Sequence, residues 1–79
     1  MISPRQIKAA RSLLGWSQQN LADKAILSLN TIKQLEVGKT DPKTSTLMAI
    51  KTTLESAGVE FLPASGNRGE GVRLISTDL

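Results

Sequence analysis

The stretch Ser17–Gly38 reads SQQNLADKAILSLNTIKQLEVG, and its pattern predicts two short helices joined by a tight turn. Ser17 and Ser28 suit the N-caps of the two helices, and Gly38 suits the end of the second. After each cap, apolar residues recur at the spacing of three and four that places them on one helical face: Leu21, Ala22, Ala25, Ile32 and Leu35.

The second of these helices has an outward surface made of the residues between its apolar positions: Leu29, Asn30, Lys33 and Gln34. This surface carries two amides, one cation and no carboxylate. It suits the groove of a DNA duplex, because an Asn or Gln amide matches the donor and acceptor edge of adenine and carries no charge that phosphates repel. Leu29 is unusual on such a surface, although an apolar group can contact the methyl group of thymine.

The stretch resembles the motif of the phage repressor and Cro type helix-turn-helix family, over roughly positions 3 to 57 of this chain. The matching residues are Ser17, Gln18, Leu21, Ala22, Ala25, Ser28, Ile32, Leu35, Glu36 and Gly38. The resemblance implies that residues 28–36 form a DNA-recognition helix with Asn30 and Gln34 as base readers. Because Leu29 and Lys33 share their outward surface, we expect base contacts from Leu29, Asn30, Lys33 and Gln34. The resemblance further implies DNA-backbone contacts from Gln18, Ser28, Thr31, Lys39, Thr40 and Lys43; for the loop after Gly38, an ordinary connection is the alternative.

The resemblance also implies an ion pair between Arg11, in the first helix of the chain, and Glu36, at the end of the recognition helix. Such a pair would orient the recognition helix and would not contact DNA. Removing one partner of a partly buried pair leaves a stranded charge, so we expect either side chain to matter for folding.

One position departs from the family. Ile26 stands in the turn where the family usually has glycine. A β-branched residue with a positive φ costs about 1–2 kcal/mol. Either this turn is built without a left-handed residue, or the protein carries that cost.

Composition limits the classes of function. The chain has 79 residues and neither Cys nor His, so we expect one small domain with no disulfide, metal site or cofactor. No window approaches the ~20 apolar residues of a membrane span, which predicts a cytoplasmic protein.

Residues 1–51 hold eight Lys or Arg against three Asp or Glu, whereas residues 52–79 hold two against four. A basic body suits a phosphate-rich partner, although a solvated surface explains the same excess.

The flanking segments complete a mainly α fold: a compact bundle of about four helices containing the helix-turn-helix, followed by a short β extension of two strands. Ser3, Pro4 and Gln6 predict a first helix with the apolar stripe Ile7, Ala10, Leu13 and Leu14, ended by Gly15. Thr44 or Ser45 is the expected cap of a further helix that runs to Gly58. We therefore assign residues 1–58 to the helical domain and 59–79 to the extension.

In the extension the apolar period changes to two, which predicts two strands around a nine-residue loop. An isolated pair of strands is marginal in water, so another surface must cover its apolar side. We expect the same segment of a second subunit to do so, forming a sheet between chains; a hairpin packed on the helices of its own chain is the alternative. The expected dimerisation residues are Val59, Phe61, Leu62, Val72, Leu74 and Ile75.

These patterns favour a sequence-specific transcriptional regulator, a repressor that binds a near-palindromic operator in double-stranded DNA as a homodimer. The alternative is an antitoxin-type or adaptor protein whose tail binds a protein partner. An enzyme is disfavoured, because the acids are scattered and the sequence lacks a Gly-rich phosphate loop and the usual His or Cys nucleophiles and bases.

Overall fold

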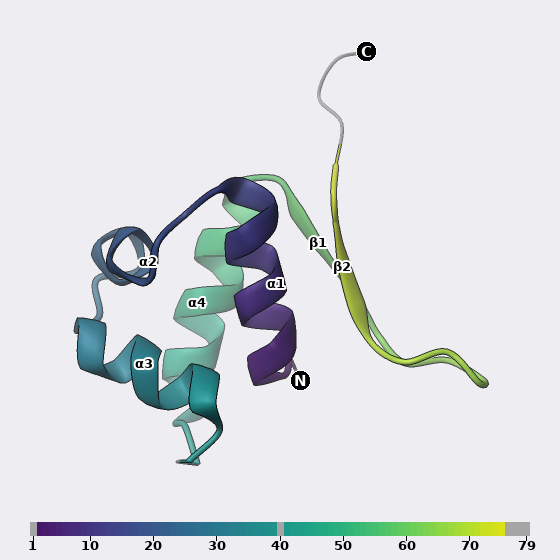
Figure 1. Ribbon diagram of the computed structural model, residues 1–79, viewed down its shortest axis with the longest axis horizontal. Helices are drawn as coiled ribbons and strands as arrows, with labels where there is room; N and C mark the ends of the chain where they lie inside the picture. The colour runs from purple at the N-terminus through teal and green to yellow at the C-terminus, as the bar shows by residue number, and fades with distance from the viewer. Residues whose placement is uncertain (1, 40, 76–79) are drawn as a thin grey trace.

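The computed structural model describes residues 2–39 and 41–75. The described chain contains four helices and a two-stranded antiparallel sheet (Figure 1). Their bounds are α1 Pro4–Leu14, α2 Gln18–Ala25, α3 Leu29–Val37, α4 Thr44–Ser56, β1 Val59–Leu62 and β2 Gly71–Leu74. The mainly α class, with a helical bundle and a C-terminal β extension, is confirmed.

Side-chain caps fix where the first three helices begin. Ser3 accepts a hydrogen bond from the Gln6 backbone N–H at 3.2 Å, and the Gln6 side chain accepts one from the Ser3 N–H at 2.8 Å. Ser17 makes the same reciprocal pair with Asn20, and Ser28 accepts from the Thr31 N–H at 3.1 Å. These caps satisfy N–H groups that lack partners within a helix, so the predicted starts are confirmed.

The start of α4 differs from the expectation. Its N-cap is Lys43, which makes no side-chain capping bond, and not Thr44 or Ser45. Those two hydroxyl residues already lie inside the first turn, and a side chain caps only from the position before the first helical residue. The helix also ends at Ser56, with Ala57 as its C-cap, two residues before Gly58.

The core lies between the four helices and the first strand. Its largest fully buried side chains are Ile7, Leu21, Ile32, Ile50, Leu54 and Val59. Each helix therefore contributes at least one residue to a single cluster. Leu13 is an exception to the predicted stripe of α1, because it is 43% exposed, whereas Leu14 packs against the core.

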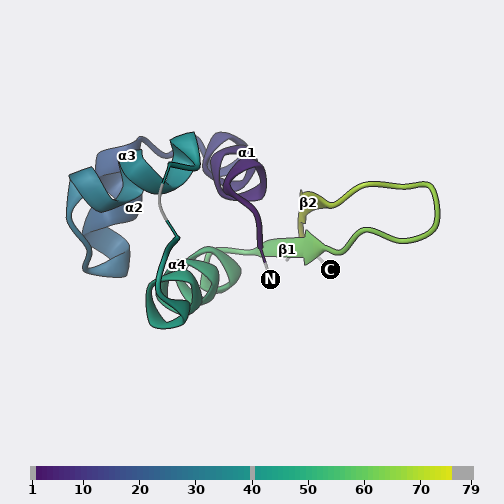
Figure 2. The same ribbon diagram turned by 90° about the horizontal axis from the view of Figure 1, so that it is seen from below.

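The two strands pair with each other within the chain as an antiparallel hairpin. Val59 lies opposite Leu74, and Phe61 lies opposite Val72. Helices α1 and α4 lie against one side of this hairpin (Figure 2), where Val59 is buried and Phe61 and Val72 pack against the core. This is the alternative arrangement, a hairpin packed on the helices of its own chain, in place of a second subunit covering the apolar side. The chain's own helices provide the apolar cover that the sequence pattern requires.

Gln6 fastens the hairpin to the helices. Its side-chain amide nitrogen donates to the carbonyl oxygens of Leu62 at 3.2 Å and Gly71 at 3.0 Å, the pair at which the two strands separate. Gln6 is the buried polar residue of the described core, and its amide oxygen accepts the Ser3 N–H. The start of α1 and the loop end of the hairpin ladder are thus held together by one satisfied side chain.

The turn between α2 and α3 keeps the left-handed conformation that the family's glycine would adopt. Ile26 has φ 57° and ψ 50°, and its side chain is 90% exposed. Its backbone N–H reaches the carbonyl groups of Ala22 and Asp23, which closes the end of α2. The protein therefore carries the cost that a Cβ atom adds in the left-handed region, and burial of the side chain does not offset it.

Replacing Ile26 should reveal that cost. We expect Ile26→Gly to raise the free energy of unfolding by up to about 1 kcal/mol, because relief of strain outweighs the added freedom of the unfolded chain. Thermal unfolding measures the change. Ile26→Ala is the matched control, since it removes the same exposed branch but keeps a Cβ, and it should change stability little. A loss of stability in the glycine variant would contradict this account.

Candidate nucleic-acid interface

The surface of α3 that faces away from the core matches the predicted outward residues. Ile32 and Leu35 turn inward and are buried, while Asn30 and Lys33 are exposed. Leu29 and Gln34 are half-buried at the two margins of the exposed side. The helix therefore presents two amides and an ammonium group to a partner from one side.

Val37 belongs to the same surface, although the sequence analysis did not include it. It is the last residue of α3, is 63% exposed, and follows Asn30 by seven residues, which is close to two helical turns. The seven-residue spacing was the available signal, but a branched apolar residue near a helix end resembles a core position. We call Leu29, Asn30, Lys33, Gln34 and Val37 the outer face of α3.

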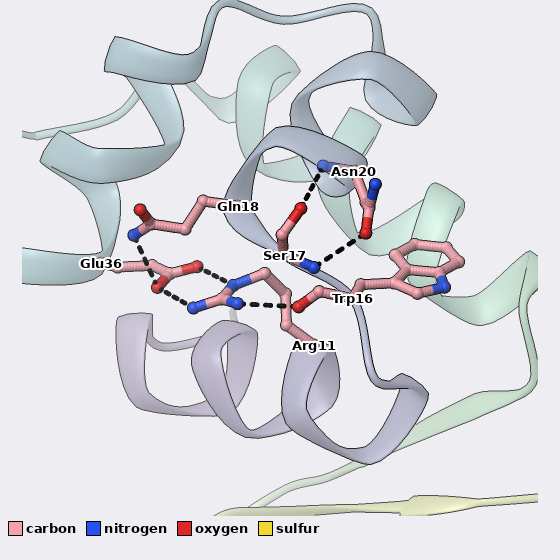
Figure 3. Close-up of polar contacts among 6 residues, drawn as sticks. All are labelled: Arg11, Trp16, Ser17, Gln18, Asn20 and Glu36. Atoms are coloured by element: carbon pink, nitrogen blue, oxygen red, sulfur yellow. Dashed lines mark hydrogen bonds and ion pairs between the residues drawn. The ribbon is translucent and has the colours of Figure 1, made fainter.

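A buried ion pair locks α3 to α1. The Arg11 Nε atom lies 2.6 Å from Glu36 Oε2, and Arg11 Nη2 lies 2.7 Å from Glu36 Oε1 (Figure 3). The side chains are only 14% and 4% exposed. The hydrogen bond to Glu36 raises the pKa of Arg11 above its ordinary value, although burial alone would lower it. Two parallel bonds between planar groups fix the angle of α3 as well as its distance from α1.

Both members of this ion pair also form hydrogen bonds with residues at the start of α2. Arg11 Nη1 donates to the carbonyl oxygen of Trp16 at 2.9 Å, next to the Ser17 cap. The Gln18 side-chain amide donates to Glu36 Oε1 at 3.2 Å (Figure 3). Gln18, expected at the DNA backbone, is therefore also part of the network that holds α1, α2 and α3 in register.

The other residues expected at the DNA backbone lie at the two ends of α3. The Ser28 and Thr31 hydroxyls are 2.8 Å apart at its start, and Lys39 and Lys43 are exposed in the segment after its end. Thr40 lies outside the described residues. Among the residues that the structure does describe, the ion pairs involve other cations, so Lys33, Lys39 and Lys43 have no carboxylate partner.

The charge of α3 itself is consequently one-sided, and Asp41 is the exposed carboxylate of the segment that follows it. Glu36 is the carboxylate of α3, and its negative charge is turned inward and neutralised by Arg11. The exposed ammonium groups of Lys33, on the outer face, and of Lys39 and Lys43, beyond its C-terminal end, remain available to an anion. An exposed helix that carries amide groups and one cation, with two further cations after its end, fits a DNA groove, where phosphates flank the base edges.

The order of helices, the tight turn and this exposed helix define a helix-turn-helix DNA-binding domain. A family model described as helix-turn-helix matches residues 7–56, and the chain belongs to this family, of the phage repressor and Cro type. No curated protein matches the sequence. The family consists of DNA-binding transcription regulators, and the chain is accordingly a DNA-binding regulator. No helix in the described part of the chain has the length and apolar character needed to cross a membrane.

Removing the carboxylate should show what the ion pair does for the fold. We expect Glu36→Gln to lower the free energy of unfolding by about 3 kcal/mol, because the buried Arg11 charge is stranded. The melting temperature should fall by more than about 10 °C in a domain of this size. Glu55→Gln, which alters an exposed carboxylate of α4 outside the ion pairs above, should leave the melting temperature nearly unchanged. Equal melting temperatures for the two variants would exclude this role for the pair.

Proposed function

We propose that this protein is a repressor that binds a near-palindromic operator in double-stranded DNA as a homodimer. The observation that carries the proposal is the outer face of α3, which exposes Asn30 and Lys33 while the helix's carboxylate is held by Arg11. In this proposal α3 enters the major groove, and Asn30 and Gln34 form paired hydrogen bonds with adenine edges. In this proposal the bound dimer represses by occupying a promoter.

Phosphate contacts set the position of α3 in the groove. Lys39 and Lys43 follow its C-terminal end, and the Ser28 and Thr31 hydroxyls lie at its start. Contacts at both ends would clamp the helix between the two sugar-phosphate strands. The two lysines add affinity for any sequence through release of counterions, whereas the amides of the outer face distinguish sequences.

The dimer surface that we propose is smaller than the sequence suggests, because Val59, Phe61 and Val72 are used within the chain. The apolar side chains that stay exposed near the hairpin are Leu74 at 49% and Ile75 at 54%, with Leu13 of α1 at 43%. Helix α1 and strand β2 contact each other, so both elements can contribute to one surface. A two-fold pairing would place two α3 helices on half-sites about one DNA turn, ~34 Å, apart.

Substitutions on the outer face and beyond its end should have different signatures in DNA binding. Asn30→Ala should lose about 1–3 kcal/mol at particular base pairs only, because a bidentate contact is removed. Lys39→Ala should weaken binding to all sequences alike and reduce the salt dependence by about one phosphate contact. Selection from random duplexes, followed by titration at two salt concentrations, measures both effects.

The matched control is Gln19→Ala, an exposed amide on α2 that bonds Asp23 within its own helix. It should change neither sequence preference nor salt dependence. Failure of the unaltered protein to enrich any duplex would refute the proposed function. Identical behaviour of the Asn30 and Lys39 variants would refute the division between base and backbone contacts.

The proposed dimer surface has its own test. Replacing Leu74 and Ile75 together by Ser should shift the protein from dimer to monomer in sedimentation experiments and weaken binding to a two-half-site duplex. Met48→Ser is the control, because Met48 is an equally apolar side chain, 61% exposed, on α4. If the double variant stays dimeric, these residues serve some other contact and the proposed surface is incorrect.

A further inference from the structure

We propose that the outer face of α3 selects A·T-rich half-sites, with Leu29 and Val37 contacting the 5-methyl groups of thymine while Asn30 pairs with adenine. This inference rests on the proposed function and specifies the DNA that the domain accepts. It is carried by the two apolar residues of the outer face, of which Val37 is 63% exposed.

The geometry of α3 allows several base pairs to be contacted in one groove. Leu29 and Val37 are the first and last residues of the helix, and Asn30 lies two turns before Val37 on the same side. Seven residues of α-helix span about 10.5 Å. That length corresponds to about three base steps of 3.4 Å, so Asn30 and Val37 can contact different bases of one half-site.

The chemistry available on this helix favours A·T pairs. A thymine methyl offers an apolar contact in the major groove, and adenine offers the donor and acceptor pair that an Asn or Gln amide matches. Guanine is most often read by Arg, and α3, all of whose residues are described, contains none. Cytosine is read by a carboxylate, but that of Glu36 is turned inward and bound to Arg11. Lys33 is the one side chain of the outer face suited to guanine.

The charges around the helix identify DNA as the occupant of this apolar surface. Lys33 lies between Leu29 and Val37 along α3, and Lys39 follows two residues after Val37. Both ammonium groups are exposed and have no carboxylate partner among the described residues. An apolar residue set among free cations matches a groove in which methyl groups lie between phosphates.

Deoxyuridine provides a direct test, because it is thymine without the 5-methyl group. A duplex enriched from a random library is resynthesised with deoxyuridine at one thymine at a time, and its affinity for the unaltered protein is measured. We expect A·T-rich half-sites and a loss of about fourfold at each contacted thymine, the value of one buried methyl group.

Variants then assign each thymine to a side chain. Val37→Ala should remove the sensitivity to deoxyuridine at one position and leave it at another, which Leu29→Ala should remove. Asn30→Ala is the matched control: it should bind more weakly yet keep both sensitivities. Thermal unfolding of the Leu29 variant verifies that this half-buried substitution leaves the helices folded, and the deoxyuridine measurement on the unaltered protein is independent of it.

The outcomes separate this inference from the function on which it rests. An enriched duplex that is G·C-rich, or one that binds equally well with deoxyuridine at every thymine, would overturn the inference and leave DNA binding intact. Enrichment of no duplex would overturn the proposed function itself. Sensitivity that persists in both the Val37 and Leu29 variants would show that other residues contact the methyl groups, and would also overturn the inference.

Discussion

The bidentate ion pair between Arg11 and Glu36 is the contact on which the rest of the domain depends. It joins α1 to α3 and, through Gln18 and the Trp16 carbonyl, also fixes the start of α2. A buried pair adds little net stability, but its geometry permits only one orientation of α3. The same bond removes the negative charge of the helix from the surface that would meet phosphates. One interaction thus sets both the shape and the charge of the candidate interface.

Gln6 and the strained residue Ile26 also help to fix how the elements of the domain are arranged. Gln6 joins the start of α1 to the loop end of the hairpin ladder, so the β extension is attached to the helical body. Ile26 holds the turn between α2 and α3 in a left-handed conformation at a cost in stability. That cost is tolerable because the core residues on both sides of the turn, Leu21 and Ile32, are fully buried and determine how the two helices pack.

Most local features of this fold could be predicted from the sequence, although the cap of α4 was not. Distant packing could be predicted only for Arg11 and Glu36, where the family resemblance supplied the pair. The side chains of Ser3, Ser17 and Ser28 each accept a hydrogen bond from the backbone N–H three residues later. Their capping roles can therefore be predicted from the sequence alone. The two strands could also be predicted, from the alternation of apolar residues. That alternation does not show whether Phe61 and Val72 are covered by α1 and α4 or by another chain. Val37 was missed because only the folded structure shows that a branched residue at the end of α3 is exposed.

The central claim is that α3, held by Arg11 and Glu36, is the element that meets DNA. Nuclear magnetic resonance of the isotopically labelled protein, titrated with a duplex enriched from a random library, tests it at every backbone amide. We predict that the largest chemical-shift changes fall on residues 28–39 and on the start of α2, with small changes in β1. Changes confined to the hairpin, with the amides of α3 unaffected, would contradict the account.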